Sequence, residues 1–115
     1  MLIPTPRSIL VATEPVDFRN SIDGLAAYVE LHLHEPPLSG QMFVFFNKRR
    51  NGLRLLVWDH GGFVLVFKRL ERGRFRIPTQ SRLSVAELAA VLEGIDLTNS
   101  RRLPRWNPDQ HGVTR

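Results

Sequence analysis

Residues 41–69 read QMFVFF-NKRRNG-LRLLVW-DHGG-FVLVFKR, three short apolar runs separated by two turn-like segments. Runs of this length, rich in aromatic and β-branched residues and bounded by Gly or Asn, predict β-strands. The strands are expected at residues 41–46, 53–58 and 63–69. An Asn-Gly pair, a typical hairpin signal, closes the first turn-like segment. Because short connections join strands that run in opposite directions, the stretch predicts an antiparallel three-stranded meander.

The segment before the meander predicts one more strand and a helix. Residues 8–13 (SILVAT) form an apolar, β-branched run that is typical of a strand. Apolar residues then recur at steps of three and four from Phe18 to Leu33, which predicts a helix. Asp17 stands just before this run and is the expected N-cap, because its carboxylate can accept a hydrogen bond from a free backbone N–H group.

The segment after the meander predicts a second helix. Ser84 and Glu87 have the spacing of a capping box, in which each side chain accepts a hydrogen bond from the other residue's backbone N–H. The apolar pattern that follows predicts a helix from Val85 to Leu92. Gly94 stands two residues after Leu92, at a position where glycine commonly ends a helix.

Together these elements predict an α+β domain over residues 1–97, with an antiparallel sheet of three to four strands packed by two helices. Residues 98–115 are polar and aperiodic, so we expect a flexible basic tail with Trp106 as its one apolar anchor.

The third strand of the meander has apolar side chains on both faces. Two helices leave part of such a sheet uncovered, which favours a homodimer.

The composition excludes several classes of protein. A chain of 115 residues is long enough for one domain with a modest core. It contains no cysteine, which excludes disulfides, thiolate metal sites and Cys nucleophiles. Residues 1–7 lack the apolar core of a signal peptide, and no apolar run approaches the roughly 20 residues that span a bilayer. We therefore expect a soluble cytoplasmic protein without membrane contact.

Positive charge is concentrated in one part of the chain. Residues 48–76 contain nine Lys or Arg and two acidic residues, a balance of +7, whereas residues 1–47 carry −3. Such a block predicts a surface for a polyanion such as DNA, although a solvated sheet edge explains it as well. In a meander, the first loop and the end of the third strand lie at one edge, so the candidate DNA-binding residues are expected to form one patch. They are Lys48, Arg49, Arg50, Lys68, Arg69, Arg72, Arg74 and Arg76.

This patch predicts contacts with phosphates rather than with base edges. Guanidinium groups bind phosphates in a bidentate manner, and affinity gained in this way falls steeply with salt. Trp58 ends the second strand and is expected near the patch, where it either stacks on a base or belongs to the core.

Several short motifs together resemble those of a known family. They are Asp17-Phe18-Arg19 with Asp23-Gly24-Leu25, and residues 43–50, 55–59, 62–75 and 92–96. In this order and spacing the chain resembles the TnpB accessory proteins of the insertion sequence 66 family of bacterial transposable elements, encoded by the element's second reading frame. The resemblance covers roughly residues 8 to 97.

The resemblance implies a role in DNA transposition beside a separate, larger transposase that holds the catalytic acidic residues. It singles out motif residues besides the candidate DNA-binding ones. They are Asp17, Arg19, Asp23, Gly24, Trp58, Asp59, Glu71 and Gly73.

A catalytic or metal-binding role has weaker support. The acidic residues Asp17, Asp23, Asp59, Glu71 and Asp96 are a candidate two-metal nuclease site. Three of them have simpler explanations: Asp17 as a helix cap, Asp59 as a turn residue and Glu71 as an ion-pair partner. The pair of His residues at positions 32 and 34 suits a helix C-terminus without any metal. We expect no catalytic residue, metal or cofactor.

Three functional hypotheses follow from the sequence. The leading one is a non-catalytic accessory protein that binds DNA and assists the transposase. The second is an adaptor with little DNA affinity that binds the transposase or a second copy of itself. The third is a small metal-dependent nuclease.

Overall fold

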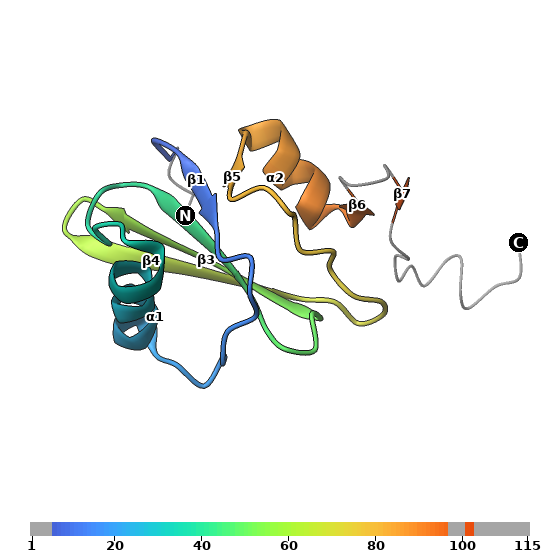
Figure 1. Ribbon diagram of the computed structural model, residues 1–115, viewed down its shortest axis with the longest axis horizontal. Coiled ribbons are helices and arrows are strands. Elements are labelled where there is room, and N and C mark those ends of the chain that lie inside the picture. Colours follow the sequence, from blue (N-terminus) through green and yellow to red (C-terminus); the bar gives the residue numbers. More distant parts are fainter. Residues whose placement is uncertain (1–5, 97–100, 103–115) are drawn as a thin grey trace, which may run out of the picture.

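The computed structural model describes residues 6–96 and 101–102 and contains a five-stranded sheet in the order β4-β3-β2-β1-β5 (Figure 1). Three consecutive strands form its larger part: β2 (Met42–Phe46), β3 (Gly52–Asp59) and β4 (Gly62–Arg69). They pair antiparallel, with Leu55 of β3 between Val44 and Val66. The predicted meander is therefore confirmed, and each strand begins and ends within one residue of its predicted bounds.

Two shorter strands complete the sheet on the other side of β2. β1 (Ile9–Val11) runs parallel to β2, because the chain between them crosses over through a helix. β5 (Arg82–Leu83) pairs antiparallel with β1 and was not predicted. A two-residue strand has no repeating pattern that a sequence can reveal. The α+β class is confirmed, with one parallel pair in a mostly antiparallel sheet.

The first helix begins later than predicted. It consists of α1 (Ile22–Tyr28), which continues directly as the π-helical turn η1 (Val29–Leu33). Ser21 is its N-cap, and the Ser21 hydroxyl accepts a hydrogen bond from the backbone N–H of Gly24 at 3.3 Å. The prediction that Asp17 caps this helix is wrong. Both residues are of a capping type, but only the Ser21 side chain reaches a free N–H group of the helix.

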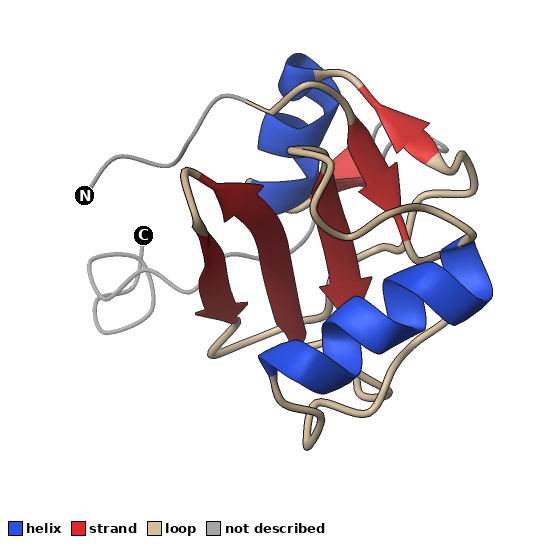
Figure 2. Ribbon diagram, turned by 90° about the vertical axis from the view of Figure 1, so that its left-hand side faces the viewer, coloured by secondary structure: helices blue, strands red, loops and turns tan. Residues whose placement is uncertain are grey.

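The two helices cover opposite faces of the sheet (Figures 1 and 2). Leu25 and Val29 of the first helix pack with Phe43 and Phe45 on one face, and all four side chains are fully buried. The other face carries a separate cluster that includes Phe46 and the second helix. Neighbouring residues of a strand point to opposite faces, so both faces of β2 are apolar and buried.

The second helix, α2 (Val85–Leu92), has its predicted bounds. The Ser84 hydroxyl accepts a hydrogen bond from the Glu87 backbone N–H at 3.0 Å, and the Glu87 carboxylate accepts one from the Ser84 N–H at 2.8 Å. The predicted capping box is thus confirmed. Leu88 and Val91 anchor the helix in the core.

β4 forms one edge of the sheet, and within the described residues it pairs only with β3. Val64 and Val66 pack on the α2 side, whereas Phe63 and Leu65 pack on the α1 side. The two-sided apolar character of this strand is confirmed. Phe67, near its end, remains 54% exposed.

Near the C-terminus, β6 (Ile95–Asp96) pairs antiparallel with β7 (Arg101–Arg102). The rest of the segment predicted as a basic tail, including Trp106, lies outside the described residues. No helix in the described part of the chain is long and apolar enough to cross a membrane.

Candidate nucleic-acid interface

The loop between β2 and β3 and the loop after β4 are joined by backbone hydrogen bonds. The N–H of Leu70 donates to the carbonyl of Asn51 at 2.7 Å, and the N–H of Phe75 donates to the carbonyl of Arg50 at 2.6 Å. These bonds extend the β3–β4 pairing beyond the strand ends. Two basic segments that lie far apart in the sequence are therefore neighbours in the structure.

The first of these loops is held in shape by its own polar groups. Asn47 accepts a hydrogen bond from the N–H of Gly52 at 3.0 Å and donates one to the Asn51 side chain at 2.8 Å. Arg50 has φ +60° and donates its N–H to the Asn47 carbonyl at 3.0 Å. The cations at positions 48 and 49 therefore project from a backbone that is fixed at both ends.

The second loop is anchored in the core by Phe75. This side chain is fully buried in the cluster beneath α2, and its ring centroid lies 5.9 Å from that of Phe46. Gly73, two residues earlier, has φ +76°, a conformation that side chains rarely adopt. The anchor and the turn together keep Arg72 and Arg74 at the surface.

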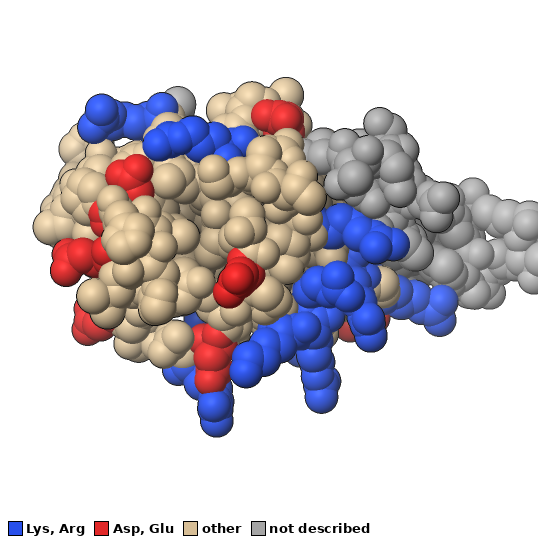
Figure 3. Space-filling model, in the orientation of Figure 1, with Lys and Arg blue, Asp and Glu red and all other residues tan. Residues whose placement is uncertain are grey.

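We call the eight predicted cations at these two loops the basic edge. Figure 3 shows Lys and Arg side chains gathered at this end of the sheet, while Asp and Glu lie mostly elsewhere on the same view. All are exposed except Arg50, which is half-buried. The residues of the basic edge are Lys48, Arg49, Arg50, Lys68, Arg69, Arg72, Arg74 and Arg76.

The cations of the basic edge differ in how they are held. Lys68 donates to the carbonyl of Leu92 at 2.7 Å, so it neutralises the C-terminal end of α2, where carbonyl groups favour a positive charge. Arg69 lies 3.5 Å from Glu71, which confirms the ion-pair interpretation of this acid. Lys68 is therefore less free to bind a ligand than the sequence suggested.

Trp58 lies at the opposite end of β3 from the basic edge. It pairs with Phe63 across the strands, and the two rings meet edge to face with centroids 5.0 Å apart. Asp59 follows it in the β3–β4 turn, as predicted, and lies 2.8 Å from His60. Trp58 is five positions along the strand from Leu53, a distance of roughly 16 Å. The expectation that Trp58 lies near the patch is therefore wrong.

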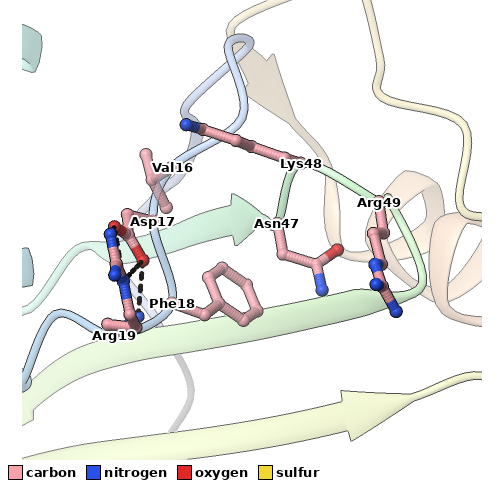
Figure 4. A pocket seen from close by; sticks show the side chains of 7 residues that line it. All are labelled: Val16, Asp17, Phe18, Arg19, Asn47, Lys48 and Arg49. Carbon is pink, nitrogen blue, oxygen red and sulfur yellow. Dashed lines mark hydrogen bonds and ion pairs between the residues drawn. The ribbon is translucent and has the colours of Figure 1, made fainter.

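A shallow pocket of about 230 Å³ opens beside the basic edge (Figure 4). One wall comes from residues 16–19, before α1, and the other from residues 47–49, in the first basic loop. Figure 4 shows the Phe18 ring projecting from the first wall towards Asn47, with Lys48 extending from the loop towards Val16. The pocket thus combines the Asp17-Phe18-Arg19 motif with part of the basic edge.

Asp17 and Arg19 form a tight ion pair in one wall of this pocket. The Arg19 guanidinium donates to Asp17 at 2.7 Å, and the Arg19 backbone N–H donates to the same carboxylate at 2.9 Å. These hydrogen bonds lower the pKa of Asp17 from 3.8 to about 2. The Asp17 carboxylate is therefore ionised at neutral pH and holds the Arg19 guanidinium in place.

Among the residues that the structure describes, the other candidates do not come together as a metal site. Across the described part of the chain, no three His, Asp or Glu side chains form a group that could hold a metal ion. Asp23 lies in the first turn of α1, and His32 stacks on Tyr28 with ring centroids 4.5 Å apart. His34 ends η1 with φ +56°. Of the predicted acidic set, the side chain of Asp96 lies outside what the structure describes.

Gly24 lies close to the segment that precedes α1. A Cβ atom at this position would lie 3.1 Å from the Asn20 side chain, so little space remains there. The absence of a side chain at Gly24 therefore permits close packing of this segment against the helix.

Sequence reasoning missed the residues that build the interface. Phe75 stands in a run of charged residues and is buried in the structure. A single aromatic residue among arginines is the sequence signal that indicates such an anchor. Phe18 and Asn47 belong to motifs that lie far apart in the sequence, so their meeting in one pocket depended on how the chain crosses over to β2.

Comparison with known proteins places these features in context. The chain matches the family model described as IS66 Orf2 like protein over residues 7–102. It is 39% identical over 104 residues to the uncharacterized protein y4jC of Sinorhizobium fredii, covering 87% of this chain and 89% of that protein. The uncharacterized protein y4hO of the same organism is 34% identical over 118 residues, with 96% and 100% coverage. No solved structure matches the chain.

Proposed function

The chain belongs to the IS66 Orf2-like family of transposition accessory proteins, and on that premise we propose that it binds DNA through the basic edge and assists a separate transposase of the same element. The proposed role is non-catalytic and belongs in the bacterial cytoplasm, where the DNA of the element lies. The transposase supplies the strand cleavage and joining, and this protein supplies a DNA-binding surface.

One observation carries the proposal: the two basic segments are clamped together by the hydrogen bonds between Leu70 and Asn51 and between Phe75 and Arg50. Because like charges repel one another, these cations stay together only where the backbone holds them, and the resulting positive potential attracts a polyanion. Within the described residues, Lys48, Arg49, Arg72 and Arg74 have no hydrogen-bond or ion-pair partner. Free guanidinium and ammonium groups of this kind suit phosphate oxygens.

The surface favours contact with the DNA backbone over direct reading of bases. Its cations come from two loops and the end of β4, and neither described helix presents them as a row that could enter the major groove. Phosphate contacts fix position without sequence information. We therefore propose binding that tolerates many sequences, with the choice of site left to the transposase.

A homodimer is part of the same proposal. The β4 edge offers eight residues whose outer backbone groups pair with no other strand in the described part of the chain. Residues 62–67 of this strand carry no charge, and Phe67 exposes an apolar ring beside the edge. A second copy pairing there would satisfy the free edge, and in a two-fold symmetric dimer the two basic edges would lie at opposite strand ends of the β4 seam.

A salt-titrated DNA-binding assay tests the proposal. With six or more phosphate contacts, the affinity for a duplex of arbitrary sequence should fall by orders of magnitude between about 50 and 200 mM salt. Absence of binding by the wild-type protein at low salt would overturn it. The adaptor hypothesis would then stand, with the same arginines docking an acidic surface of the transposase.

A further inference from the structure

The pocket between residues 16–19 and 47–49 is too small for a large ligand. Its volume of about 230 Å³ lies below the roughly 300–1,000 Å³ of pockets that enclose a drug-sized molecule. Its walls include the apolar side chains of Val16 and Phe18 and the polar groups of Asp17 and Asn47. A flat heterocycle with polar edges, the size of one nucleic-acid base, suits such a lining.

The charges around the pocket divide into an inner and an outer part. Asp17, in the wall, is ion-paired with Arg19 of the same wall, so the pair carries no net charge and leaves no free cation in that wall. A phosphate inside the pocket would have to compete with the Asp17 carboxylate for the Arg19 guanidinium. Lys48 and Arg49, in the opposite wall, are exposed and belong to the basic edge. The arrangement therefore suits a base inside the pocket and its phosphates on the cations outside.

The aromatic side chain in the pocket wall, Phe18, is held by two residues that do not line the pocket. The guanidinium carbon of Arg54 lies 4.4 Å from the centroid of the Phe18 ring, and Phe67 meets the same ring edge to face at 6.1 Å. Arg54 also donates to the carbonyl of Asn20 at 3.0 Å, which fixes the segment that carries Phe18. A ring fixed in this way contacts a base at little cost in side-chain entropy.

From this geometry we propose that the pocket accepts one unpaired base of the DNA bound to the basic edge. The inference rests on the proposed DNA-binding function and extends it: the protein prefers DNA with an extrahelical or unpaired nucleotide over a fully paired duplex. Such nucleotides arise where strands are opened or distorted, as at DNA ends undergoing rearrangement. Binding of this kind selects a DNA structure rather than a sequence.

Three DNA probes test the inference with the wild-type protein at one salt concentration. They are a fully paired duplex, the same duplex with one extrahelical thymine, and the same duplex with an abasic nucleotide at that position. The last two share backbone charge and flexibility and differ only in the base. We expect the extrahelical thymine to raise the affinity over the abasic probe by between about 5-fold and about 150-fold, the range for a base stacked on an aromatic side chain.

Two protein variants assign this difference to the pocket. Phe18→Leu keeps an apolar side chain but removes the aromatic ring, and it should reduce the preference for thymine over the abasic probe to less than about 2-fold. Phe63→Leu makes the same change on the same face of the sheet at the far end of β4, and the preference should remain. Thermal unfolding of both variants checks that each is folded.

The outcomes separate the two proposals. Equal affinity for the thymine and abasic probes, together with salt-dependent binding of the duplex, would overturn the pocket assignment and leave the basic edge in place. A preference that survives Phe18→Leu in a folded protein would also overturn it. No binding of any probe at low salt would remove the proposed DNA-binding function itself, and the pocket assignment with it.

Discussion

Gly52 packs directly against the ring of Phe18: a Cβ atom at Gly52 would lie 3.1 Å from Cε2 of that ring. The same Cβ would lie 2.9 Å from the Asn47 amide nitrogen and 3.2 Å from the Phe67 ring. Gly52 begins β3 at the point where the pocket, the first basic loop and the edge strand meet. The absence of a side chain there lets all three approach one another.

This close approach predicts that Gly52→Ala destabilises the fold. The added methyl group must displace the Asn47 amide or one of two packed rings, and overpacking of this kind costs about 1–3 kcal/mol. Chemical denaturation measures the change in the free energy of unfolding. Gly62→Ala is the matched control, because no atom lies within 4 Å of a Cβ at that position. Equal stability of the two variants would contradict the packing described.

The basic edge predicts a change in the salt dependence of DNA binding. Replacing Arg69, Arg72 and Arg74 together by Ala should lower the slope of log K against log salt by roughly 0.9 for each phosphate that is no longer bound, about three phosphates in all. These side chains are exposed, so the variant should remain folded. A titration of a duplex probe at several salt concentrations measures the slope.

The control for this experiment removes exposed arginines elsewhere on the sheet. Arg7→Ala with Arg82→Ala takes away two charges near β1 and β5, outside the basic edge. The slope should then change by much less than in the triple variant. A similar decrease of the slope in both proteins would mean that net charge, rather than the basic edge, determines binding.

The ion pair between Asp17 and Arg19 predicts a specific titration. Asp17 has a folded pKa of about 2, below its usual 3.8, so the ion pair stabilises the fold above about pH 4 and loses this effect as the pH falls towards 2. Arg19→Ala should return the pKa of Asp17 towards 3.8, as measured by NMR of the side-chain carboxyl groups. The pKa of Glu87, lowered by its hydrogen bonds with Ser84, should stay low in the same variant.

The free edge of β4 predicts a dimer that depends on Phe67. Phe67→Thr keeps a residue that favours strands but removes a ring that is 54% exposed. Burying the exposed half of two such rings is worth about 2 kcal/mol, so the dimer dissociation constant should rise about 30-fold. Sedimentation equilibrium measures it. Val85→Thr, at an even more exposed apolar position on α2, should leave it unchanged. A wild-type protein that is monomeric at high micromolar concentration would contradict the dimer.

The sequence predicts local elements of this fold well because their signals are local. The meander follows from runs of apolar residues and short turns, and α2 follows from the Ser84 and Glu87 capping box. The start of α1 was missed because Asp17 and Ser21 are both capping residues, and only the folded chain decides which one reaches an N–H group. The parallel place of β1 depends on a crossover whose length and direction carry no local signal.

The sequence predicted which residues form the candidate site better than it predicted where they lie. The two basic loops were expected at one edge because a meander places them there, and the structure joins them by backbone hydrogen bonds. The bond from Lys68 to Leu92 and the distance of Trp58 from the loops depend on how remote parts of the chain pack together. The pocket depends on the same kind of packing, because its two walls come from opposite sides of the α1 crossover.

The place of β1 in the sheet has a consequence for the order of folding. Residue 9 must pair both with residue 42, beyond the first helix, and with residue 83, near the other end of the described chain. Loops of such length close slowly, whereas the hairpins of the meander close through a few residues. We therefore expect β2, β3 and β4 to form first and β1 to be inserted between its neighbours later. The surface proposed for DNA would then form from the part of the chain that folds fastest, before the sheet is complete.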